Sequence, residues 1–225
     1  MKYPFELISL HIPKSAGTSF RLILQDVYGE DAVQRLDINK QDGILLNQES
    51  VTISQIPAGL KVAHGHFSYS EFKQFFGEPQ APIITWLRNP VARVVSQYYF
   101  LQERFEDQVI HSRNSRNVFK RLCRSLEEFA AVPGNRNLQS RYLQGLRPED
   151  LDFIGIVEFF EEDLQELAGK MGWETYEPIH DNKTRNKERE EVSPDVLRLI
   201  ADLNSEDLSL YETVLSLRNK TLKGE

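Results

Sequence analysis

The stretch that decides the fold runs from Leu7 to Arg21 and reads Leu-Ile-Ser-Leu-His-Ile-Pro-Lys-Ser-Ala-Gly-Thr-Ser-Phe-Arg. The apolar run over residues 5–12 has the length of a buried strand, and Pro13 interrupts it. Small residues follow, and an amphipathic helical pattern occupies residues 17–28. A strand, a tight turn of small residues and a helix N-terminus bring backbone N–H groups and the positive end of the helix dipole to one place. The stretch therefore predicts a site for a phosphate-like anion.

Three side chains would complete such a site. Lys14 supplies a point charge, and Thr18 and Ser19 supply hydroxyl donors. In a nucleotide triphosphate loop, Gly-Lys-Ser/Thr closes a longer glycine-rich loop, whereas here the lysine precedes Gly17. The other interpretation is an ordinary strand-to-helix turn in which a Ser or Thr side chain caps the helix.

The composition is that of a soluble globular protein, with 40% hydrophobic and 27% charged residues. A length of 225 residues suits one large α/β domain, and we predict a single domain over residues 1–225. The net charge of −7 disfavours nucleic acid and anionic membranes as partners. Cys123 is the only cysteine, which excludes an internal disulfide. The first six residues lack the apolar core of a signal peptide and no run has transmembrane length, so we expect a soluble, cytoplasmic protein without a membrane span.

Strand-like and helix-like patterns alternate along the rest of the chain. Strands are predicted at 61–64, 82–87 and 153–157. Helices are predicted at 69–76, from Pro90, from the second half of 104–124 through Leu126 and Phe129, at 160–171, from Ser193 and from Ser205. Residues 30–58 are predicted to form an irregular, polar surface excursion, and residues 181–191 a charged loop. The alternation predicts an α/β protein with three α/β/α layers and a central parallel sheet.

Three stretches with polar side chains directly follow predicted strands: Pro13 to Ser19, His64 to His66, and Arg88 to Ser96. Because the carboxyl ends of parallel strands meet at one edge of the sheet, we expect all three stretches to open there. A Mg²⁺-dependent phosphotransferase usually has an aspartate at the end of such a strand. An arginine there binds anions instead, so Arg88, with Ser96 and Arg93 in the helix that follows, is a second candidate anion site.

The two histidines of the His64-Gly65-His66 segment point to one face if the segment is extended. Histidine can act as a general base near neutral pH. A zinc site is a rival interpretation, but no third ligand has a suggestive spacing. A histidine satisfied by core hydrogen bonds is the third interpretation for at least one of the pair, and His11, inside the first strand, is expected to be structural.

These stretches together resemble a known family. Pro13 to Ser19 resembles the 5′-phosphosulfate loop of sulfotransferases that use 3′-phosphoadenosine 5′-phosphosulfate (PAPS), and residues 87–100 resemble their 3′-phosphate element. His64-Gly65-His66 followed by Tyr69 is similar to the catalytic strand of the heparan and dermatan uronyl 2-O-sulfotransferases. Further matching stretches lie at 137–143, 153–155 and 207–211, so that the resemblance spans nearly the whole chain. It implies a sulfotransferase fold of the P-loop NTPase-like kind.

The resemblance also implies roles for individual residues. Lys14 would stabilise the leaving phosphate oxygen, and His66 would take the acceptor proton, with His64 orienting it or contacting the acceptor. The remaining implied nucleotide ligands are Ser15, Gly17, Thr18 and Ser19 at the 5′-phosphate, Arg88 and Ser96 at the 3′-phosphate, and Lys183 in a loop that closes over the nucleotide.

We therefore predict a PAPS-dependent sulfotransferase that acts without a metal on a hydroxyl of a carbohydrate or other small alcohol. The acidic balance of the chain argues against a strongly polyanionic, heparan-like acceptor. Two alternatives stay open. One is a metal-independent phosphate-binding transferase or a small-molecule kinase, and the other is a nucleotide-binding module without catalysis.

Overall fold

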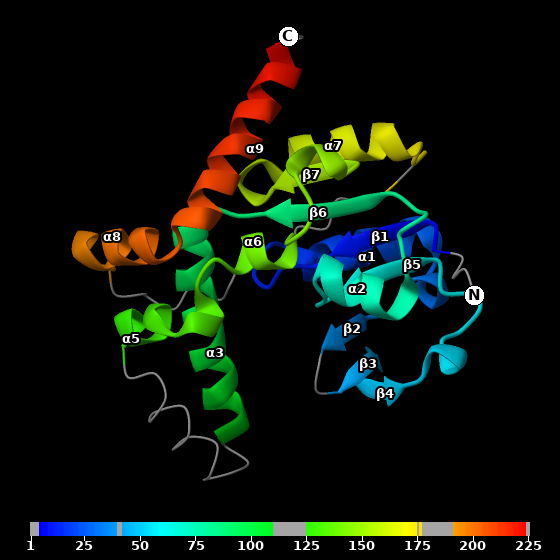
Figure 1. Cartoon of the computed structure of the whole chain (residues 1–225), viewed down its shortest axis with the longest axis horizontal. Coiled ribbons are helices and arrows are strands. Elements are labelled where there is room, and N and C mark those ends of the chain that lie inside the picture. The colour runs from blue at the N-terminus through cyan, green and yellow to red at the C-terminus, as the bar shows by residue number, and fades with distance from the viewer. Residues whose placement is uncertain (1–4, 40–41, 110–124, 175, 177–190, 224–225) are drawn as a thin grey trace. The chain divides into compact units, whose positions relative to one another are not determined.

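The computed structural model describes residues 5–39, 42–109, 125–174, 176 and 191–223. The chain forms two compact units (Figure 1). The first unit comprises Met1–Leu87 and Arg141–Asn186, and the second comprises Arg88–Ser140 and Lys187–Glu225.

The first unit is built on a parallel sheet of four strands. Its strands are β1 (Leu7–Leu10), β5 (Val62–Gly65), β6 (Ile83–Leu87) and β7 (Phe153–Ile156), in the order β5-β1-β6-β7. All but one of their residues are buried, as expected for parallel strands whose two faces are both covered. The predicted central parallel sheet is confirmed.

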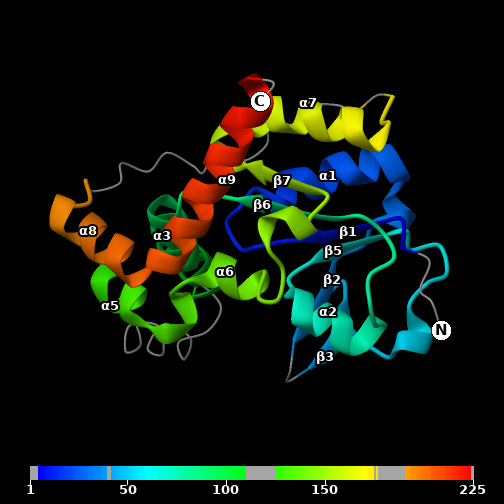
Figure 2. The ribbon, with the colours of Figure 1, turned by 45° about the horizontal axis from the view of Figure 1, so that its top comes forward.

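Helices cover both faces of this sheet. Apolar side chains of α1 (Gly17–Tyr28) and α7 (Phe160–Met171) share one cluster with the sheet. Figures 1 and 2 place α2 (Tyr69–Phe76) across the sheet from α1. Ser68 and Glu71 form a capping box that starts α2, so its beginning is encoded locally. The first unit therefore has the predicted three layers.

The prediction for residues 30–58 is wrong, because they form a second, antiparallel sheet of β2 (Leu36–Asn39), β3 (Gly43–Leu46) and β4 (Glu49–Val51). The polar character of the segment comes from its exposed turns, while Leu36, Ile38 and Ile44 are buried. β2 lies against the end of β5: the Ile38 N–H donates to the His66 carbonyl over 3.1 Å. A side chain at Gly65 would overlap the Leu36 carbonyl, so only glycine allows this close approach.

The second unit is helical, with α3 (Pro90–Val109), α5 (Leu126–Ala131), α8 (Pro194–Leu203) and α9 (Ser205–Lys223). The short α6 (Leu138–Tyr142) begins in this unit, and its last two residues belong to the first. The starts of α3, α8 and α9 agree with prediction, and Ser193 caps α8 as expected. Buried apolar residues of α3, α5 and α8 form one core cluster: Val94, Tyr98, Leu126, Phe129, Ala130 and Ile200.

Single 3₁₀ turns connect several of these elements. They are η1 (Glu30–Ala32), η2 (Ile53–Gln55), η3 (Pro133–Asn135), η4 (Pro148–Asp150) and η5 (Val157–Phe159). The helix predicted from the second half of 104–124 through Phe129 falls partly on residues 110–124, outside the described residues, as does most of the charged loop with Lys183. The last part of this predicted helix, with Leu126 and Phe129, lies in α5. Among the helices of the described ranges, none combines the length and the apolar character that a membrane crossing requires.

Candidate functional site

The loop after β1 has an unusual backbone for residues with side chains. Lys14 (φ 68°) and Ala16 (φ 57°) both adopt the left-handed conformation, which costs on the order of 1 kcal/mol or more at each non-glycine position. Ala16 is the N-cap of α1 and makes no side-chain capping bond. A left-handed residue followed by a helical one turns successive N–H groups toward one concavity. The observed turn is therefore not the Ser- or Thr-capped turn of the other interpretation, and it suits an anion.

The predicted nucleotide ligands of this loop lie together at the start of α1. Ser15 is 1% exposed, and its Oγ has no hydrogen-bond partner among the described residues. Lys14 is half-buried, Ser19 is buried and Thr18 is exposed. Gly17 packs so closely on the His11 ring that a side chain at this position would overlap it. Glycine is therefore required at position 17, because the ring of His11, the residue directly after β1, leaves no room for a side chain.

His64 is engaged through both ring nitrogens. Its Nδ1 lies 2.9 Å from Ser9 Oγ, and its Nε2 lies 3.1 Å from the Gly17 carbonyl oxygen. The carbonyl only accepts, so Nε2–H donates to it, and Nδ1 accepts from the Ser9 hydroxyl. Burial lowers the pKa of His64 to about 3, which keeps the ring neutral. With no ring nitrogen left for a proton, a substrate or a zinc ion, His64 fits the interpretation of a histidine satisfied by buried hydrogen bonds.

We expect His64→Ala to lower the free energy of unfolding by about 3 kcal/mol, because the Ser9 hydroxyl and the Gly17 carbonyl each lose a buried partner, at about 1–3 kcal/mol per group. Urea denaturation at pH 7 measures this loss. Wild-type stability should also fall as the pH drops from about 6.5 toward 3, since only the unfolded state takes up the His64 proton there. His64→Gln should show a shallower decline, and an unchanged urea midpoint for His64→Ala would contradict the structural role.

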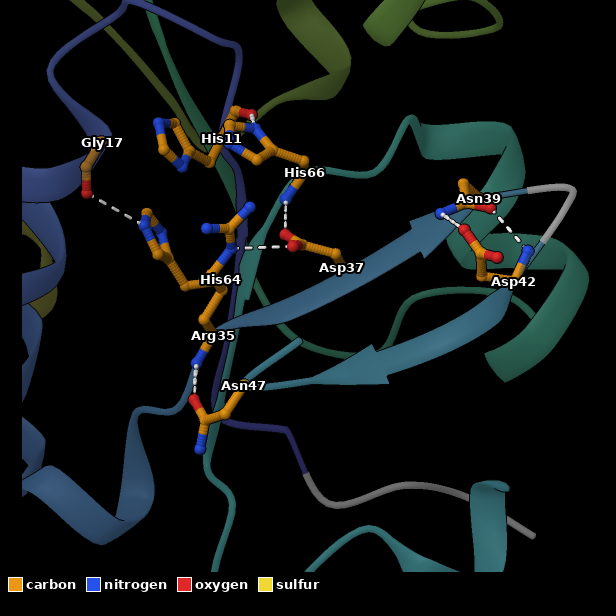
Figure 3. Close-up of polar contacts among 9 residues, drawn as sticks. All are labelled: His11, Gly17, Arg35, Asp37, Asn39, Asp42, Asn47, His64 and His66. Atoms are coloured by element: carbon orange, nitrogen blue, oxygen red, sulfur yellow. Dashed lines mark hydrogen bonds and ion pairs between the residues drawn. The ribbon is translucent and has the colours of Figure 1, made fainter. Parts of the chain in front are cut away.

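His66 is held differently, and Figure 3 shows its contacts. Its Nδ1 lies 2.8 Å from the His11 carbonyl oxygen, and its backbone N–H donates to Asp37 Oδ1 over 2.8 Å. Because a carbonyl only accepts, Nδ1 carries the proton and the lone pair of the neutral ring is on Nε2. Within the described part of the chain, no partner occupies Nε2. Burial lowers the pKa of His66, although the His11 carbonyl and the Asp37 carboxylate oppose that shift. His66 therefore has the tautomer and the neutral charge state of a general base.

The His11 ring lies between the other two, with ring centroids 4.2 Å from His66 and 5.1 Å from His64 (Figure 3). Burial lowers the pKa of His11 well below its ordinary value. Three neutral rings can stack in this way, whereas protonated rings would repel each other. His11 thus supplies a carbonyl to His66 and a ring surface to both, in agreement with its predicted structural role.

Asp37 and Arg35, on and beside β2, are site residues that sequence reasoning missed. Arg35 Nε pairs with Asp37 Oδ2 over 2.7 Å, while the other carboxylate oxygen holds His66 (Figure 3). The available signal was an aspartate between Leu36 and Ile38, two apolar residues that the structure buries. A charge in such a place indicates a buried polar partner.

The second candidate anion site belongs to the second unit. Arg88 is the first residue after β6, and Ser96 is a buried residue of α3. Arg93, the third candidate, is 1% exposed and donates from Nη2 to the Asn135 carbonyl over 3.0 Å. This bond engages one end of the guanidinium within the second unit. Gln139 was missed as well, and it contacts the backbone of Arg88 on both sides.

The predicted site residues thus fall into three groups. The Lys14 loop, His64 and His66 meet at the carboxyl ends of β1 and β5, which run parallel with Leu10 opposite Gly65. Arg88 and Ser96 lie in the second unit, and Lys183 lies outside the described residues.

Comparisons with known proteins agree with this architecture. The model of the Sulfotransferase family matches residues 2–212. A sulfotransferase from Alicyclobacillus acidocaldarius of known crystal structure superposes with a TM-score of 0.50 at 16% identity, covering 94% of this chain and 96% of that one. This likeness supports the predicted α/β sulfotransferase fold.

Curated relatives are similar over a shorter region. Heparan sulfate 2-O-sulfotransferase 1 of Cricetulus griseus is 35% identical over 106 residues, and that of Homo sapiens is 36% identical over 104. Each match covers 43% of this chain and 29% of the relative, so less than a third of the relative's length is matched. The predicted resemblance to this branch is confirmed over the matched region.

Proposed function

Because the chain belongs to the sulfotransferase family, we propose that it transfers the sulfuryl group of PAPS to a hydroxyl group of an acceptor. The observation that carries the proposal is the pairing, at one edge of the parallel sheet, of an uncapped helix start with a histidine whose accepting nitrogen is unoccupied within the described residues. The first feature suits a phosphosulfate, and the second suits a hydroxyl proton.

In the proposed reaction, His66 Nε2 takes the proton of the acceptor hydroxyl while the hydroxyl oxygen forms a new bond to sulfur. The bond between sulfur and the bridging phosphate oxygen breaks, and that oxygen keeps the electron pair. The ammonium group of Lys14 stabilises the charge that develops on it. No step needs a metal ion, because the lysine and the helix start supply the positive potential.

The proposed nucleotide ligands are the predicted ones. The turn N–H groups, the buried Ser15 hydroxyl and the hydroxyls of Thr18 and Ser19 would bind the 5′-phosphate. Arg88 and Ser96 would bind the 3′-phosphate, and the remaining predicted ligand, Lys183, lies outside the described residues. A guanidinium can bind a phosphate through two parallel hydrogen bonds, which makes Arg88 the main determinant of 3′-phosphate recognition.

For the acceptor we propose a carbohydrate hydroxyl. The support is the similarity to heparan sulfate 2-O-sulfotransferase 1 over 106 residues. The net charge of −7 favours a neutral or weakly acidic glycan over a dense polyanion. An acceptor series of rising charge, assayed with labelled PAPS at low and high salt, tests this preference.

Calorimetric titration with 3′-phosphoadenosine 5′-phosphate (PAP), 5′-AMP and ATP with Mg²⁺ tests the proposed function. We expect a clear preference for PAP, followed by transfer from labelled PAPS that persists in EDTA. A preference for ATP with metal-dependent turnover would support the kinase instead. PAP binding without transfer across a broad acceptor panel would support the non-catalytic module.

Arg88→Ala should weaken PAP binding by about 10- to 100-fold, because a charged hydrogen-bonding partner of a phosphate contributes about 1.5–3 kcal/mol. Binding of 5′-AMP, which lacks the 3′-phosphate, should change less than about twofold. Titration of both nucleotides into wild type and variant measures the difference. An equal loss for both nucleotides would mean that Arg88 does not recognise the 3′-phosphate.

A further inference from the structure

Both polar atoms of the buried Gln139 side-chain amide form hydrogen bonds with the backbone of Arg88. Its side chain is 0% exposed. Oε1 accepts the Arg88 backbone N–H over 2.9 Å, and Nε2 donates to the Arg88 carbonyl over 3.0 Å. This is the pairing that a neighbouring strand would offer, made by a side chain at the point where the chain leaves β6. Burying an amide costs free energy unless its hydrogen bonds are made. The two bonds to the Arg88 backbone therefore account for a buried glutamine at this position.

Gln139 is itself held in place by a second buried polar side chain. Asp207, in the first turn of α9, is 0% exposed. Its carboxylate accepts the backbone N–H groups of Gln139 over 3.1 Å and of Ser140 over 2.7 Å. In return the Asp207 N–H donates to Asn137 Oδ1 over 3.3 Å. The start of α6 is therefore fixed to α9, and the backbone of Gln139 is held in place.

The chain on the other side of Arg88 is also fixed. Asn89 Oδ1 accepts the Ala92 N–H over 3.1 Å, which caps the first turn of α3. Pro90 follows and restricts the backbone of Asn89 to extended conformations. Arg88 thus stands between a buried strand and a capped helix, and Gln139 fixes the peptide groups on both sides of its Cα.

We propose that Gln139 is a positioning residue that holds the Arg88 backbone so that the guanidinium meets the 3′-phosphate of the nucleotide. The inference rests on the proposed function, since it assigns Arg88 to that phosphate. A preorganised arginine binds more tightly than a mobile one because less conformational entropy is lost on binding. Gln139 therefore contributes to affinity for the 3′-phosphate without touching it.

The test compares PAP and 5′-AMP binding in Gln139→Met, which keeps the volume and removes both hydrogen bonds. We expect PAP affinity to fall about tenfold, the effect of losing about 1.4 kcal/mol, and 5′-AMP affinity to stay within about twofold. In an Arg88→Ala background, Gln139→Met should cause no further loss, because the glutamine acts through the arginine. Ile200→Val, in the apolar core of the same unit, is the matched control for reduced stability and should bind both nucleotides normally.

The possible results distinguish a failure of the proposed function from a failure of this inference. A wild-type protein that does not prefer PAP to 5′-AMP overturns the proposed function and this inference with it. If wild type prefers PAP and Gln139→Met keeps that preference, or loses both nucleotides equally, the inference alone is overturned. A full Gln139→Met effect in the Arg88→Ala background also overturns it. Should Gln139→Met fail to fold, Gln139→Glu keeps the acceptor for the Arg88 N–H, and it should lose PAP affinity a few-fold with 5′-AMP unchanged.

Discussion

His66→Ala is expected to reduce turnover by about 10²- to 10⁴-fold, the usual contribution of a positioned general base. Affinity for PAP should hardly change, because the imidazole acts on the acceptor hydroxyl. The free energy of unfolding should fall less than in His64→Ala, since the His66 ring has one hydrogen-bond partner, the His11 carbonyl, whereas the His64 ring has two. Single-turnover rates with labelled PAPS, PAP titration and urea denaturation measure the three quantities.

The pH dependence gives an independent check on the same residue. Burial places the pKa of His66 below 6.5, so the base is neutral at pH 7, and kcat/KM should decline only as the pH falls below that pKa. His66→Gln, which keeps much of the volume but cannot take a proton at these pH values, is the matched variant and should remove this acid limb from any residual activity. If His66→Ala turns over normally while His64→Ala folds and does not, the base assignment is wrong.

Lys14→Ala should lower kcat by about 10²- to 10³-fold, the typical effect of losing one transition-state charge stabiliser. Affinity for PAPS should fall much less, because the charge on the bridging oxygen develops only as the S–O bond breaks. Alanine is the suitable replacement: Lys14 has φ 68°, and glycine would relax the loop backbone as well as remove the charge. Rates at saturating PAPS and equilibrium binding of the nucleotide separate the two effects.

Lys61→Ala is the matched control for this change of charge. Lys61 is exposed and pairs with Glu6 over 3.0 Å directly before β5, at the amino end of that strand. The Lys61→Ala substitution removes one positive charge from the first unit, as Lys14→Ala does, and should leave kcat unaltered. Equal losses of turnover and of nucleotide affinity in Lys14→Ala would contradict a transition-state role and indicate simple phosphate binding.

The elements with strong local signals were predictable. The helix bounds 17–28, 69–76 and 160–171 agree with α1, α2 and α7, because their apolar faces repeat at the helical period and local stop signals end them. The sheet of residues 30–58 was not predictable, since alternations of apolar and polar residues only two to four residues long, broken by polar turns, carry little periodic signal. Their sheet is stabilised by contact with the end of β5, which no local pattern records.

The candidate site divides in the same way. Residues 7–21 determined by themselves the strand, the turn and the helix start, and with them the place of Lys14, because an apolar run, a proline and small residues leave few other conformations. Only the tertiary structure distinguishes the surroundings of the two histidines, through partners 47 to 55 residues away in the chain. The tautomer of His66 depends on the His11 carbonyl. The backbone position of Arg88 depends on Gln139, which lies 51 residues further along the chain. Hydrogen bonds of this range arise when strands and helices pack, so the residue types indicate the chemistry, and the packing determines which partners each residue has.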